Sequence, residues 1–172
     1  MRRKIIVALI IIICYLLQTT VFPSLAFASI TPNLMIVAVS SFGFMRGRKE
    51  GLWIGFFCGL LLDIFNGSIL GFYALLYMYI GYTNGMFRKL FYPEDIKLPI
   101  LLISASDLSV NLLVYFFMFL FRNRYNFEYY FLHLMVPELV YTMIITVILY
   151  TLLLKINRKL EVSEKRSASK FV

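Results

Sequence analysis

The stretch GLWIGFFCGLLLDIFNGSILGFYALLYMYIGYTNG, residues 51–85, decides the fold. It consists of two apolar runs, which together contain one charged residue, Asp63. Between the runs lie Asn66 and Gly67, a pair that favours a tight turn. Runs this apolar belong in a lipid bilayer rather than on the surface of a soluble protein. We therefore predict a hairpin of two membrane helices, over residues 51–65 and 69–87.

Four further apolar runs flank this hairpin, at residues 5–22, 33–45, 98–121 and 132–154. Of the 172 residues, 61% are hydrophobic and 15% are charged, whereas a soluble domain is about half apolar and a quarter charged. The prediction is an all-α integral membrane protein with one six-helix domain over residues 1–154 and a basic tail over 155–172. The second and third spans, of about 13 and 15 residues, are short for a membrane helix. We expect them to tilt little, to thin the bilayer, or to form a partly re-entrant hairpin.

The basic residues predict the orientation of these spans, because cytoplasmic loops of membrane proteins are rich in Lys and Arg. Fifteen of the 17 Lys and Arg residues fall before span one, between spans two and three, between four and five, or after span six. Both termini are therefore expected in the cytoplasm. The net charge of +8 is spread over loop ends and forms no continuous stripe, so we predict no nucleic-acid binding. The tail is expected to be loosely ordered, with anionic lipid or an acidic protein as candidate partners.

Two other segments have specific interpretations. Residues 122–131 are rich in Tyr and Phe, and they are expected to lie at the outer membrane–water boundary. The N-terminus resembles a secretory signal, with Arg2, Arg3 and Lys4 before an apolar run and Ala26-Phe27-Ala28 as a cleavage motif. Removing that run would leave five spans and would put the later basic loops on the wrong side of the membrane. We therefore expect an uncleaved first helix.

The inventory of reactive side chains argues against an enzyme. His133 is the single histidine, and Cys14 and Cys58 lie in apolar runs without a second Cys or a His nearby in sequence. Nucleophilic triads and metal sites need such groups in combination. We predict no catalytic residue, no metal and no cofactor.

Glycines recur at four-residue spacing and form a smooth helix face. The series comprises Gly43, Gly47, Gly51, Gly55 and Gly59, followed by the pairs Gly67/Gly71 and Gly81/Gly85. Small residues at this spacing let membrane helices approach closely. The face suits packing within the chain, or a partner membrane protein, or a second copy in a homodimer. The candidate positions are Gly51, Gly55, Gly59, Gly67 and Gly71.

Acidic side chains within or at the ends of the spans also need an explanation, since charge is costly in lipid. Asp63, next to the turn at Asn66, is expected to accept backbone N–H groups at the start of the fourth span. Glu138 follows Pro137 at the start of span six, where a structural role within reach of water is expected.

Asp107 lies near the middle of span five and shares a helix face with Ser104 and Asn111. This polar face must point into the protein, where it serves either helix packing or a ligand or partner site. No Lys or Arg lies within a span to pair with Asp107. A charged carboxylate there would need hydroxyl, amide or water partners, and a protonated carboxyl group is the alternative.

Several of these motifs together resemble one known family. They are Gln18-Thr19-Thr20, Thr31-Pro32-Asn33-Leu34, Arg46-Gly47-Arg48, GFFCGLLLD at residues 55–63 and GSILGFYAL at residues 67–75. The chain resembles the MreD family of rod shape-determining proteins over about residues 18–88. The resemblance implies a non-enzymatic, multi-pass scaffold of the bacterial inner membrane that works in cell shape and peptidoglycan synthesis. Its implied partners are the bitopic protein MreC, the filament protein MreB, the glycosyltransferase RodA and a class B penicillin-binding transpeptidase.

The family is also similar, in helix count and fold, to the substrate-binding subunits of energy-coupling-factor vitamin transporters. This similarity supplies an alternative function. In it, a polar cavity at Ser104, Asp107 and Asn111 binds a small solute. In the scaffold hypothesis, the glycine-rich helices present a surface to the membrane helix of an MreC-like partner.

Overall fold

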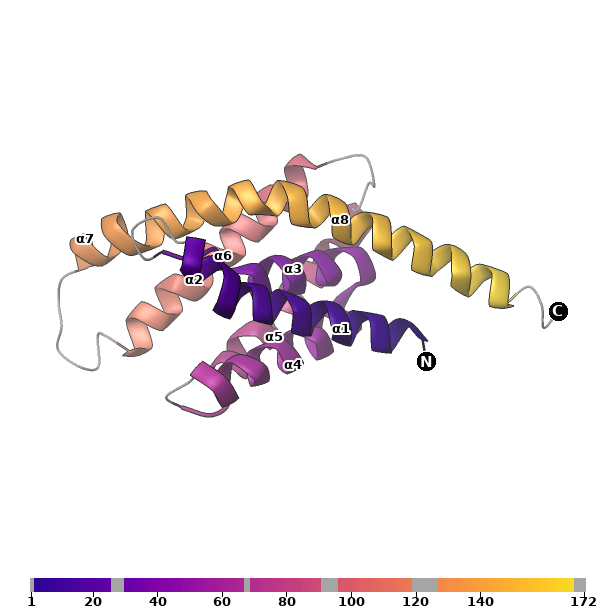
Figure 1. Ribbon diagram of the computed structural model, residues 1–172, viewed down its shortest axis with the longest axis horizontal. Helices are drawn as coiled ribbons and strands as arrows, with labels where there is room; N and C mark the ends of the chain where they lie inside the picture. The colour runs from indigo at the N-terminus through magenta and orange to yellow at the C-terminus, as the bar shows by residue number, and fades with distance from the viewer. Residues whose placement is uncertain (1, 26–29, 67–68, 91–95, 119–126, 169–172) are drawn as a thin grey trace.

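The computed structural model describes residues 2–25, 30–66, 69–90, 96–118 and 127–168, which are helical over most of their length, and these residues contain no strand (Figure 1). The first helical segment is α1 (Arg2–Leu16), which continues through the π-helical turn η1 (Leu17–Val21) into α2 (Phe22–Leu25). The next are α3 (Leu34–Arg46), α4 (Arg48–Asn66) and α5 (Phe72–Met86), which ends in the 3-10 turn η3 (Phe87–Leu90). The last are α6 (Lys97–Met118) and the series α7 (Phe127–Tyr130), η5 (Phe131–Met135) and α8 (Val136–Ala168).

Each of the six predicted spans corresponds to one of these helical segments. Three segments are long and apolar enough to cross a membrane by length and composition, namely Arg3–Ser24, Lys97–Phe117 and Glu128–Val162. The second span is short, as expected, since α3 has 13 residues and measures about 20 Å against a hydrocarbon thickness of about 30 Å. The third is longer than expected, because α4 has 19 residues.

Helix α3 forms the core of the molecule. Every residue from Leu34 to Met45 is buried, and α3 contacts α1, α4, α5, α6 and α8. In Figure 1 it lies in the middle, with α4 and α5 on one side and α8 on the other. A helix that is apolar all round its surface is stable only where water is excluded, and here the neighbouring helices exclude it. The fold is thus one central helix wrapped by five others.

Local sequence explains where α3 begins and ends. The Asn33 side chain accepts a hydrogen bond from the Ile36 N–H at 3.3 Å, which caps the first turn. At the other end Gly47 has a φ of +97°, and its N–H donates to the Gly43 carbonyl at 2.7 Å. A side chain at this φ would be strained, so glycine is needed for α4 to start directly after α3.

The C-terminal tail differs from the prediction. Residues 155–168, expected to be loosely ordered, continue α8 as a helix that extends beyond the other helices in Figure 1. The segment contains Lys, Leu, Glu and Arg, which are good helix formers, and has no Gly or Pro to stop it. In the predicted outer segment, residues 122–126 lie outside the described residues, and the part from residue 128 is helical.

Candidate functional site

The glycines at 51, 55 and 59 lie where α4 meets α5. An added Cβ at Gly55 would lie 2.7 Å from the Tyr77 carbonyl carbon, and one at Gly59 would lie 2.5 Å from the Ala74 Cα. At Gly51 the obstacle is the backbone of Gly81. We call this contact of Gly51, Gly55, Gly59 and Gly81 the glycine seam. It is a backbone-to-backbone contact within the chain, so these positions offer no free surface to a partner.

The two remaining candidate glycines do not extend the seam. Gly67 lies outside the described residues. Gly71, grouped with the packing glycines by its spacing, precedes α5 with a φ of +97°, and an added Cβ would meet no atom within 4 Å. Its requirement for glycine therefore comes from the turn conformation and not from helix packing.

Asp63 organises the turn between α4 and α5. Its carboxylate accepts hydrogen bonds from the backbone N–H groups of Gly71, Tyr73 and Ala74 at 3.0, 2.9 and 2.9 Å. The side chain is only 3% exposed, so the three N–H groups of the α5 N-terminus find their partner inside the protein. Asn66, the other predicted turn residue, is the last residue of α4.

Asp107 lies at a junction of four helices. It is fully buried beside the side chains of Asn33 and Thr142, and neither carboxylate oxygen has a hydrogen-bond partner within the described residues. The same junction contains a hydrogen bond from the Asn33 N–H to Thr142 Oγ1 at 3.1 Å and one from the Tyr77 hydroxyl to Asn33 Oδ1 at 3.0 Å. Polar groups of α3, α5, α6 and α8 thus meet around Asp107.

The other members of the predicted polar face have different surroundings. Asn111 lies beside Glu138 of α8, a half-buried side chain that is close enough to Asp107 for the two carboxyl groups to interact electrostatically. The Ser104 hydroxyl donates to the Ile100 carbonyl of its own helix at 2.7 Å. Ser104 lines a surface groove between α6 and α8, but neither Asp107 nor Asn111 lines that groove. The groove is therefore not the polar cavity that the transporter alternative requires.

A second polar junction was not predicted from the sequence. The Asn84 side-chain amide of α5, 3% exposed, donates to Ser106 Oγ of α6 at 2.8 Å and to the Ile80 carbonyl at 2.9 Å. It also lies 3.4 Å from Ser40 Oγ of α3. The sequence did contain a signal for this junction, namely the amide of Asn84 within an otherwise apolar run. Such an amide needs a hydrogen-bond partner on another helix.

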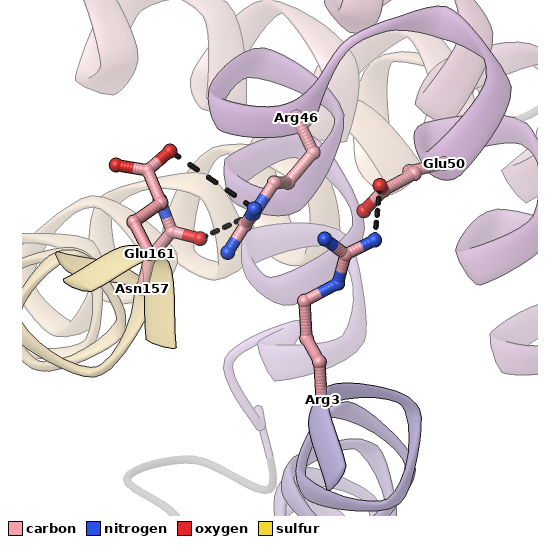
Figure 2. Close-up of polar contacts among 5 residues, drawn as sticks. All are labelled: Arg3, Arg46, Glu50, Asn157 and Glu161. Carbon is pink, nitrogen blue, oxygen red and sulfur yellow. Dashed lines mark hydrogen bonds and ion pairs between the residues drawn. The ribbon is translucent and has the colours of Figure 1, made fainter. Parts of the chain in front are cut away.

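Charged contacts join the helices at the end of the bundle where α1 begins and α3 ends (Figure 2). The Arg46 Nε donates to Asn157 Oδ1 at 2.5 Å, and Arg46 Nη1 lies 4.0 Å from Glu161 Oε1. Arg3 of α1 forms an ion pair with Glu50 of α4. From the sequence, these arginines were predicted only to set the orientation of the spans in the membrane. The structure adds that they connect α3 to α8 and α1 to α4.

Within the described residues, no three His, Cys, Asp or Glu side chains come together in a group that could hold a metal ion. What the described residues do present outward is apolar surface on the long helices. Ile5 of α1, Leu101 of α6 and Ile148 of α8 are each more than 60% exposed. Surfaces of this kind are typical of helices that face lipid.

These features define an all-α, membrane-associated protein whose polar residues join its own helices. The model of one family, described as rod shape-determining protein MreD, matches residues 1–160. The chain belongs to the MreD family, whose members are structural proteins of rod shape determination. Searches of curated proteins and of solved structures gave no match.

Proposed function

We propose that this chain is a non-enzymatic scaffold of the rod-shape complex in the bacterial inner membrane, where it binds a single-pass partner of the MreC type. The observation that carries the proposal is the family match, which covers nearly the whole chain. In this role the protein acts by binding alone and connects cytoplasmic MreB filaments to peptidoglycan synthesis by RodA and a class B transpeptidase.

The proposed topology has six membrane-spanning segments and two cytoplasmic termini. It is supported by the fifteen basic residues that fall on one side of the predicted spans. The start of α1 and the end of α8 also lie toward the same end of the molecule (Figure 1). The shorter helices α3 and α5 are accommodated because the longer helices shield them from lipid or because the bilayer thins around them.

The glycine seam gives the hairpin of α4 and α5 an indirect part in partner binding. Since the seam occupies one face of α4, the face of α4 that is available to a partner is the opposite one. Trp53 and Phe57 lie there, 60% and 54% exposed, with their rings stacked at 6.3 Å. Large aromatic side chains are the commonest anchors of protein interfaces. We place the contact with the partner's membrane helix on this aromatic face.

Purification of the tagged chain from its native host in mild detergent, with mass spectrometry of the proteins that accompany it, tests the proposal. We expect an MreC-like protein together with wall-synthesis enzymes. Replacing Trp53 and Phe57 with Ala should lower the recovery of the MreC-like protein while the chain stays as abundant as before. Tyr79→Ala is the matched control, because Tyr79 is an equally exposed aromatic residue on α5.

Two outcomes would contradict the proposal at different levels. Normal recovery of the MreC-like protein with the Trp53 and Phe57 variant would remove the aromatic face as the contact surface. Recovery of paired ATPases and a coupling subunit with the parent chain would overturn the scaffold itself.

A further inference from the structure

Asp107 of α6 has a carboxyl group that lacks a hydrogen-bond partner. The side chain is fully buried, and no hydrogen bond reaches either oxygen within the described residues. An isolated carboxylate in such surroundings costs far more free energy than folding supplies, so a group of this kind is neutralised instead. A positive charge must therefore neutralise Asp107.

No side chain in the described part of the chain supplies that charge. The six predicted spans contain no Lys or Arg, and Lys97 of α6 lies ten residues before Asp107, about 15 Å along the helix. Two titratable groups interact electrostatically with Asp107, namely Tyr77 of α5 and Glu138 of α8. A phenol is neutral, and a second carboxyl group adds negative charge. The neutralising charge is therefore a proton or a metal cation from outside the chain.

The oxygens beside Asp107 favour a proton over a metal cation. Hard metal cations take about six or more oxygen ligands in proteins. Asn33 Oδ1 already accepts hydrogen bonds from the Tyr77 hydroxyl and the Ile36 N–H, which uses both of its lone pairs. Thr142 Oγ1 accepts one from the Asn33 N–H, so it keeps a single acceptor site. One acceptor site is too few for a metal cation, but it suffices for the O–H of a protonated carboxyl group.

Glu138 supplies the second carboxyl group of the site. It is half-buried on α8 beside Asn111, and it interacts electrostatically with Asp107. Tyr73 and Tyr130 also interact with it, and phenols carry no charge at neutral pH. Two neighbouring carboxyl groups resist ionising together, so the pair keeps a proton more readily than one group alone. We propose that Asp107 and Glu138 form a proton-binding site that holds one proton on Asp107 in the folded protein.

The bound proton completes the junction of α3, α5, α6 and α8. A protonated Asp107 has an O–H that Thr142 Oγ1 is free to accept, whereas a carboxylate would leave an unpaired charge among four helices. The site is separate from the glycine seam and from the aromatic face. The proposal therefore holds or fails independently of the scaffold function and of the identity of any partner.

Infrared spectroscopy tests the proposal on the full chain in detergent, labelled with aspartate that carries ¹³C in its side-chain carboxyl group. An Asp exposed to water is ionised above about pH 4, so a protonated Asp at about pH 7 marks an unusual site. We expect the carbonyl-stretching band of a protonated carboxyl group, shifted by the label and absent from Asp107→Asn. Asp63→Asn is the matched control and should keep the band, because the Asp63 carboxylate accepts three backbone N–H groups. A parent spectrum without this band would overturn the proposal.

Assignment of the band does not require Asp107→Asn to fold. The sequence contains three Asp residues, at positions 63, 95 and 107. A label-sensitive band that persists in both Asp63→Asn and Asp95→Asn belongs to Asp107 by elimination. Loss of the band in either of these variants would contradict the proposal.

Thermal unfolding of the parent and of Asp107→Asn separates a proton from a metal cation. The folded state holds a proton that the unfolded chain releases above about pH 4, so the unfolding temperature of the parent should fall as the pH rises from about 5 to about 8. Asn has the shape of a protonated Asp and does not titrate, so the variant should show a smaller decrease. An equal decrease in both proteins would overturn the proposal. So would stabilisation of the parent by sodium chloride but not by choline chloride, if Asp107→Asn loses that response, because the site would then bind a metal cation.

Discussion

At the scale of single residues, Asp63 has the clearest role. Replacing Asp63 with Ala leaves three N–H groups at the start of α5 without their acceptor. We expect a loss of about 2 kcal/mol or more in unfolding free energy, because the loss of a helix cap alone costs 0.5–2 kcal/mol and buried donors add to it. Protein abundance in membranes and thermal unfolding in detergent measure this effect. The amount of protein should fall, whereas the protein that does fold should still bind its partner.

Asp63→Asn provides the control for this prediction, since the amide retains one oxygen that can accept a hydrogen bond. It should be less damaging than Asp63→Ala. If the Ala variant is as abundant and as stable to heat as the parent, Asp63 does not hold the start of α5 in the way described.

The glycine seam makes a second residue-scale prediction. Gly55→Leu should destabilise the protein by at least about 1–3 kcal/mol, the usual cost of overpacking, because the obstacle is the Tyr77 backbone, which cannot change rotamer. Thermal unfolding in detergent checks this. Ala8→Leu, at an exposed site on α1, adds a similar bulk and should leave the unfolding temperature near that of the parent.

Sequence alone predicted the residues whose roles depend on close neighbours or on regular spacing. Asp63 lies eight residues before Gly71, and the seam glycines of α4 repeat every four residues, so both patterns are visible in the chain itself. Asn84 and Arg46 were missed because their partners are far away in sequence. Arg46, for example, meets Asn157 across 111 residues. The positive φ of Gly71 was missed because spacing does not report backbone conformation.

At the scale of elements, the C-terminal part of α8 depends on its attachment to α3. Arg46→Gln should weaken the contacts with Asn157 and Glu161. A hydrogen bond to a charged group contributes about 1.5 kcal/mol, so backbone amide exchange in residues 155–162 should become about tenfold faster. Hydrogen–deuterium exchange with mass spectrometry measures this change.

Arg48→Gln is the control for that experiment. Arg48 is the next basic residue along the chain, and its guanidinium lies over the Tyr82 ring of α5 at 5.9 Å instead of facing α8. Exchange in residues 155–162 should therefore stay at the parent rate. Equal acceleration in both variants would show that loss of charge in the turn, rather than the Arg46 contacts, loosens α8.

Helix α3 illustrates what hydropathy patterns can and cannot predict about elements. The apolar run at residues 33–45 predicted a short helix, and a short helix is present. Its position at the centre of the bundle could not be predicted, because lipid and the interior of a membrane protein select the same apolar side chains. Only the neighbours distinguish a central helix from a peripheral one.

At the scale of the whole molecule, the proposed topology predicts which sites a reagent outside the cell can reach. Cys14 and Cys58 are free cysteines, and Ala is also small and apolar, so a background in which both are Ala is expected to fold. In that background, a membrane-impermeant maleimide should label Glu128→Cys in intact spheroplasts. It should label Lys159→Cys only after the membrane is opened. Labelling of both sites in intact spheroplasts would contradict the six-span arrangement.

The central position of α3 also has a consequence for biosynthesis. The contacts of Asn33 with Thr142 and of Arg46 with Asn157 join residues 109 and 111 positions apart. A ribosome that adds 5–20 residues per second needs roughly 5–20 s to make the intervening chain. Throughout that interval the future centre of the protein lacks the helix that will cover it. Insertion machinery or membrane lipid must therefore accommodate α3 until α8 has been made.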